Sequence, residues 1–115
     1  MLFRSGAAHA ANAPVNRSEF RLVSGSDTLR EFESSAGKMR VFCSRCGSPI
    51  YAYLRRTPEV LRIRLGTLDT PLAKRPKAHT FVSERASWAP IEDSVPQFPG
   101  WAPRDVLRQR GSKQP

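Results

Sequence analysis

The stretch Val41-Phe42-Cys43-Ser44-Arg45-Cys46-Gly47-Ser48-Pro49-Ile50-Tyr51-Ala52-Tyr53 holds both cysteines of the chain between two segments that read as strands. Two residues separate the cysteines, so both sulfurs can reach one metal ion from a tight turn. Gly47 follows at once and can supply the positive φ that folds the backbone under the ion. The pattern predicts strand, turn and strand, with Cys43 and Cys46 as two ligands of a tetrahedral zinc site.

Two other interpretations of the cysteine pair stay open at the level of sequence. The pair could be a redox dithiol, or the two thiols could be incidental. A thioredoxin-like dithiol normally opens a helix, whereas Gly47, Ser48 and Pro49 stop a helix at this point. The zinc interpretation is therefore favoured.

Length and hydropathy indicate one soluble domain. The chain has 115 residues, enough for a modest core that a metal would usefully supplement. Mean hydropathy is -0.47, and no apolar run approaches the roughly 20 residues that cross a bilayer. Residues 1–13 are too weakly apolar for a secretory signal, so we expect a cytoplasmic protein with no membrane partner. In that reducing compartment two lone cysteines favour metal binding over a disulfide.

The charge balance is strongly basic. Lysine and arginine total 19 against 10 acidic residues, which gives a net charge of +9 and a pI near 10.8. Such a balance makes nucleic acid a possible partner. However, Arg62 and Arg64 alternate with apolar residues as on the wet face of a strand, and no aromatic residues that could stack on bases interleave with the arginine clusters. Further basic residues lie in the expected C-terminal tail, at Arg104, Arg108, Arg110 and Lys113. A solvated basic surface is the favoured interpretation, and nucleic acid is not the favoured partner.

Short alternating segments between turns predict an all-β fold. The strongest alternation covers residues 60–67, and no clear period assigns residues 5–14. Pro103 favours one short helix over residues 103–108. The other segments that we expect to be extended are residues 18–23, 29–33, 39–42, 49–54, 78–82 and 88–91.

Several ordered motifs together resemble the glutathione-dependent formaldehyde-activating enzyme family, which includes centromere protein V. The resemblance covers roughly residues 6 to 101, and it implies a β-tent fold of packed antiparallel sheets. We therefore expect a domain over residues 1–101 and a basic tail over residues 102–115. The matching runs are FRLVSG at 20–25, FCSRCGSP at 42–49, LGTLD at 65–69, RPKAHTFV at 75–82, WAPI at 88–91 and PQF at 96–98.

The resemblance also implies the chemistry. Family members are similar in having a structural zinc site, built from an early Cys-x-Cys and a later Cys-x-x-Cys, and a catalytic zinc site built from a second cysteine cluster. Cys43 and Cys46 match the later Cys-x-x-Cys and so inherit the structural role, whereas no residue matches the early pair or the catalytic cluster. We expect a zinc-binding, N-terminally truncated member with impaired carbon-sulfur lyase activity on a glutathione adduct, and no catalytic residue is assigned.

The remaining ligands and the substrate contacts stay open. His9 or His79 could complete the zinc site, although a packed or hydrogen-bonded role is favoured for His79. Solvent could also complete it, or two copies of the chain could share one ion in a dimer. A glutathione-like thiol is the expected small-molecule partner. Its groove could be lined by Phe81, Trp88, Phe98 and Trp101, which are more simply core residues, and its carboxylates could meet Arg62, Arg64, Arg75 and Lys77, which are more simply surface charges.

Overall fold

A computed structural model describes residues 5–108, which fall into two compact units. One unit is Ala11–Thr70, and the other is formed by the segments on either side of it. No helix within the described range is long and apolar enough to cross a membrane. Arg110 and Lys113 of the expected basic tail lie outside the described residues.

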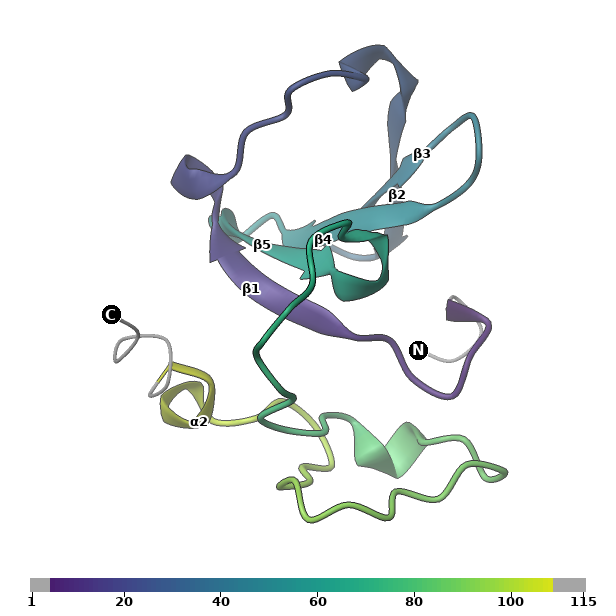
Figure 1. Ribbon diagram of the computed structural model, residues 1–115, viewed down its shortest axis with the longest axis vertical. Coiled ribbons are helices and arrows are strands. Elements are labelled where there is room, and N and C mark those ends of the chain that lie inside the picture. Colours follow the sequence, from purple (N-terminus) through teal and green to yellow (C-terminus); the bar gives the residue numbers. More distant parts are fainter. Residues whose placement is uncertain (1–4, 109–115) are drawn as a thin grey trace. The chain divides into compact units, whose positions relative to one another are not determined.

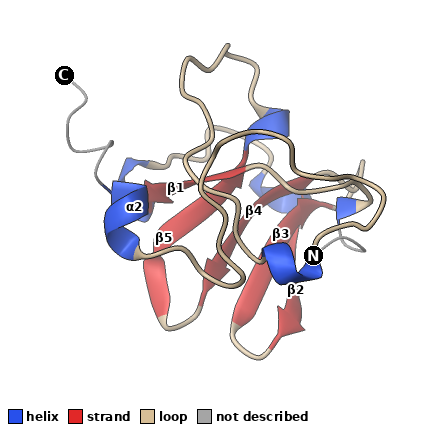
Figure 2. Ribbon diagram, turned by 90° about the horizontal axis from the view of Figure 1, so that it is seen from below, coloured by secondary structure: helices blue, strands red, loops and turns tan. Residues whose placement is uncertain are grey.

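The first unit is a single antiparallel sheet of five strands (Figures 1 and 2), which confirms the all-β prediction. The strands follow the order β1-β5-β4-β3-β2, so the last four are successive hairpin neighbours and the N-terminal strand closes the edge beside β5. Their bounds are β1 Asn12–Asn16, β2 Leu29–Ser35, β3 Lys38–Cys43, β4 Pro49–Leu54 and β5 Thr57–Arg64.

Alternation along the central strands places most of their buried side chains on one face of the sheet, although Ala52 of β4 is buried on the other face. Met39 and Val41 of β3 are buried while their neighbours are only half-buried, as period-two patterning requires. Leu61 of β5 is fully buried on the same face. Burial of one such leucine contributes roughly 2 kcal/mol, so these three side chains fix which face of the sheet is the interior.

The connection between β1 and β2 forms a wide arch (Figure 1). It contains two 3-10 turns, η1 (Arg17–Glu19) and η2 (Ser26–Thr28). The expected strand over residues 18–23 is wrong, because Phe20 packs edge-on against Tyr51 of β4 at 5.3 Å between ring centroids instead of pairing in a ladder. The strand that precedes β2 is β1, which overlaps the segment 5–14 that periodicity left unassigned.

The second unit has little regular structure. His79 and Gln97 form an isolated parallel bridge, and η4 (Val82–Glu84) follows it. The expected short strand over residues 88–91 is wrong, since the described backbone there is a turn followed by irregular chain. The expected C-terminal helix is confirmed as α2, Arg104–Arg108. A further 3-10 turn, η3 (Leu65–Thr67), belongs to the sheet unit and follows β5.

Candidate metal centre

The two cysteines lie on a tight turn between β3 and β4. Cys43 is the last residue of β3, and its carbonyl accepts a hydrogen bond from the Gly47 N–H at 2.7 Å. The Cys43 N–H in turn donates to the Ser48 carbonyl at 2.9 Å. Gly47 has a φ of 80°, in the region that side-chain-bearing residues disfavour. The expected strand, turn and strand are confirmed, and the motif does not open a helix.

The turn is anchored to the start of β2. The N–H and the Oγ of Ser44 both donate to the Thr28 carbonyl, at 2.7 Å and 2.6 Å. The Thr28 Oγ1 donates to the Gly25 carbonyl at 2.7 Å. Because Thr28 is fixed from both sides, the position of the cysteine turn is set by neighbouring backbone as well as by its own hairpin.

Backbone dipoles in the turn favour a thiolate at Cys43. The backbone N–H of Cys46, and after it that of Arg45, are directed at the Cys43 sulfur and lower the pKa of its thiol. The Cys46 Sγ lies 3.2 Å from the Ser48 Oγ. Thiolate sulfur is the form that binds metal, so the turn prepares one of its two sulfurs for coordination.

The exposure of the sulfurs suits a site that takes further ligands from outside the turn. Cys43 is half-buried, Cys46 is exposed, and both are free thiols. Two thiolates from one turn supply half of a tetrahedral zinc shell. Among residues 5–108, no group of three or more His, Cys, Asp or Glu side chains is placed to hold a metal ion. The pair therefore fits zinc as two of its ligands.

Neither histidine joins the cysteines in such a group. The His79 Nε2 lies 3.0 Å from both carboxylate oxygens of Asp93, and this hydrogen bond lowers the pKa of Asp93. The His79 N–H also donates to the Pro96 carbonyl. The expected hydrogen-bonded role of His79 is therefore what the structure shows, and His9 is exposed.

Comparison with known families supplies the identity at the level of family. The family model described as glutathione-dependent formaldehyde-activating enzyme matches residues 3–84, well over half of the 115-residue chain. The chain belongs to this family. No curated protein matches the chain. The match includes both cysteines and the whole of the five-stranded sheet.

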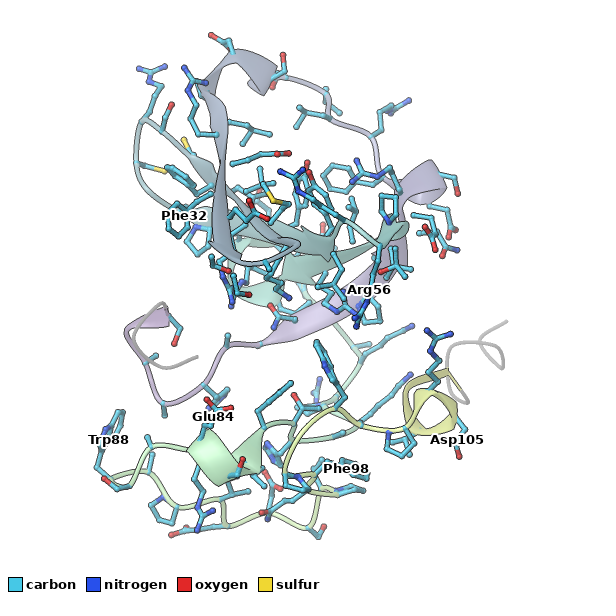
Figure 3. All side chains as sticks on the ribbon, turned by 180° about the vertical axis from the view of Figure 1, so that it is seen from behind. Phe32, Arg56, Glu84, Trp88, Phe98 and Asp105 are labelled. Atoms are coloured by element: carbon cyan, nitrogen blue, oxygen red, sulfur yellow. The ribbon has the colours of Figure 1, made fainter. Side chains whose placement is uncertain are left out.

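The aromatic residues that could line a groove in a glutathione-dependent formaldehyde-activating enzyme divide into two kinds. Phe81 and Trp101 stack edge to face at 4.9 Å between centroids, and Phe81 adopts a left-handed backbone with a φ of 55°. Phe98 is half-buried. Trp88 is 70% exposed and projects from its loop (Figure 3), and Trp101 is 53% exposed, so the core interpretation is wrong for both tryptophans.

The cations that were expected to meet the carboxylates of a ligand lie in different parts of the structure. Arg75 is used locally, because its Nη1 donates to the carbonyls of its own loop, at Leu72, Ala73 and Lys74. Arg62 and Arg64 lie on β5, on the face opposite the core. Sequence reasoning missed two more cations on that face, Lys38 and Arg40, because only the register of β3 against β4 and β5 places them there.

Proposed function

We propose that the chain is a zinc-binding member of the glutathione-dependent formaldehyde-activating enzyme family that uses the Cys43 and Cys46 thiolates as metal ligands. The observation that carries the proposal is the turn itself, in which the Gly47 N–H closes onto the Cys43 carbonyl and two backbone N–H groups lower the pKa of the Cys43 thiol. A bound zinc ion would neutralise the two thiolates and join the end of β3 to the start of β4.

The remaining ligand positions would be filled by solvent or by the same turn of a second copy. This follows from the absence of a third ligand group near the pair within the described part of the chain. A site with two protein ligands and water binds zinc more weakly than a closed site with four. A dimer that shares one ion through four cysteine sulfurs would restore the closed shell.

The family description suggests that the small-molecule partner is a glutathione adduct of formaldehyde, on which carbon-sulfur lyase chemistry acts. The chain has only two cysteines, and both are used in the proposed structural site. We therefore propose that this chain by itself binds metal and ligand but has impaired lyase activity. Cytoplasmic location remains part of the same proposal.

Metal analysis tests the proposal. The purified chain should contain close to one zinc per chain, or half that amount if two copies share an ion, and Cys43→Ser or Cys46→Ser should abolish binding. Arg45→Gln is the matched control, because it changes an exposed side chain of the same turn but leaves both sulfurs and the backbone N–H groups in place. Zinc that is absent from the wild-type chain, or retained in both cysteine variants, would overturn the proposal.

The proposal of impaired lyase activity is tested on the same protein preparations. Formaldehyde and glutathione should be consumed at the spontaneous rate with the 115-residue chain present. A clear acceleration would show that lyase activity is not impaired, and would contradict that part of the proposal without affecting the metal result.

A further inference from the structure

The two sulfurs of the cysteine turn lie close enough to bond to each other. Cys43 and Cys46 are the first and last of four consecutive residues in a tight turn, and such a turn brings its end Cα atoms to within about 7 Å. Disulfides join cysteines whose Cα atoms lie roughly 4.4–6.8 Å apart. The Cys46 side chain also lies within hydrogen-bonding range of the Cys43 sulfur. Joining the two sulfurs would therefore need little movement of the backbone.

Backbone groups fix the shape of this turn. The Gly47 N–H donates to the Cys43 carbonyl at 2.7 Å and closes the turn behind the cysteine pair. The Ser44 N–H donates to the Thr28 carbonyl at 2.7 Å and ties the segment between the sulfurs to the residue before β2. Neither hydrogen bond involves a sulfur atom. The same turn can therefore carry the sulfurs when they bind a metal and when they bind each other.

The difference in exposure sets the order of a reaction with an external disulfide. Cys46 is exposed and Cys43 is half-buried, so a small disulfide reaches the Cys46 sulfur first. The Cys46 Sγ displaces one small thiol and forms a mixed disulfide, and the Cys43 Sγ then attacks the Cys46 sulfur and displaces the second small thiol. The two departing thiols take up the two protons that the cysteines give up. The protein pair is oxidised by two electrons, and the small disulfide is reduced by two.

We propose that the Cys43–Cys46 pair is also a thiol–disulfide exchange site whose substrates are small-molecule disulfides. The intramolecular disulfide leaves neither sulfur as a thiolate, which is the form that binds metal. The zinc-bound and disulfide states of the turn therefore exclude each other, and oxidation releases the ion. This consequence for zinc rests on the proposed function, whereas the exchange itself needs only the metal-free chain.

The mass of the intact chain tests the exchange, because the sequence contains only two cysteines. The reduced, metal-free chain is treated with an excess of bis(2-hydroxyethyl) disulfide. The chain should lose two hydrogen atoms, stay monomeric and retain no part of the probe, and dithiothreitol should restore the original mass. Cys43→Ser is the control, because it removes the sulfur that closes the ring. This variant should instead keep one probe thiol on Cys46 as a mixed disulfide.

The contribution of the turn is measured from the equilibrium between dithiol and disulfide in mixtures of the probe and 2-mercaptoethanol. The equilibrium constant for forming the disulfide should be about 10-fold or more larger in the folded chain than in the urea-unfolded chain, because the turn raises the effective concentration of one sulfur at the other. Equal constants in the two states would overturn the proposal. Two probe thiols bound to each wild-type chain, or a covalent dimer in place of the oxidised monomer, would also overturn it.

Zinc added to the same samples separates this inference from the metal proposal. Zinc bound before the probe is added should protect both sulfurs, and the oxidised chain should bind no zinc until dithiothreitol reduces it. If the disulfide forms but zinc neither binds nor protects, only the metal proposal fails. If zinc binds but the metal-free chain forms no disulfide, only this inference fails. A disulfide in a chain that keeps its zinc would overturn the claim that the two states exclude each other.

Discussion

At the scale of single residues, the shape of the turn that carries the two sulfurs depends on one glycine. Gly47 has a φ of 80°, and a Cβ placed on it would meet no atom within 4 Å. The requirement for glycine is therefore conformational and not steric. The Cys-x-x-Cys-Gly spacing was enough to predict this turn. The sequence could not reveal that Ser44 and Thr28 anchor it, because that contact joins residues distant along the chain.

Gly47→Ala should destabilise the sheet unit by about 1–2 kcal/mol, the cost of a side chain in the left-handed region. Urea unfolding of the metal-free chain measures this change in the free energy of unfolding. Gly66→Ala is a close control, because Gly66 also has open space around its Cβ position but does not have a positive φ. Equal effects of the two substitutions would show that the backbone of the turn is not strained by alanine.

At the scale of elements, strands β2 to β5 follow their sequence patterns and β1 does not. Alternation predicted β3, β4 and β5 because each buries one face. β1 escaped prediction because it is an edge strand whose apolar residues are only half-buried and which tolerates Pro14, although proline is unusual in strands. The strand expected at residues 18–23 is replaced by an irregular cover, in which Phe20 is held by contact with Tyr51. Periodicity alone does not detect such tertiary packing.

Lys38, at the start of β3, should make the free energy of unfolding of the chain depend on pH. The pKa of Lys38 is lowered to about 8 in the fold, below its unfolded value of 10.5, so the unfolded chain binds more protons between these values. The contribution of Lys38 to the free energy of unfolding should therefore rise as pH increases from about 8 to about 10.5. Because the ammonium is half-exposed, solvent screening limits the gain to about 1 kcal/mol.

Urea unfolding at pH 7.5 and pH 10, compared between the wild-type chain and Lys38→Gln, isolates this contribution. The wild-type chain should gain more stability, or lose less, than the variant over that interval. An identical pH response in both proteins would mean that burial and the neighbouring cations do not lower the pKa of Lys38 in the folded state.

At the scale of the whole molecule, the ordered sequence motifs were enough to identify the family. Periodicity, in contrast, did not predict the structure of the second unit. The runs around residues 42–49 and 75–82 lie within the matched span of 3–84. The second unit relies on contacts such as the His79–Asp93 hydrogen bond and the Phe81–Trp101 pair, which leave no regular signal in sequence. Four cations lie on the sheet face opposite the core. Arg62 and Arg64 were recognised from the sequence, whereas Lys38 and Arg40 are placed there only by strand register.

The central claim is that the sulfurs of Cys43 and Cys46 bind one zinc ion together. X-ray absorption at the zinc edge of the zinc-loaded chain measures the ligands directly. We predict two sulfur neighbours per zinc at about 2.3 Å, or four if two chains share the ion. A shell that contains only nitrogen and oxygen neighbours at about 2.0–2.1 Å would contradict the account, because the metal would then be held elsewhere on the chain.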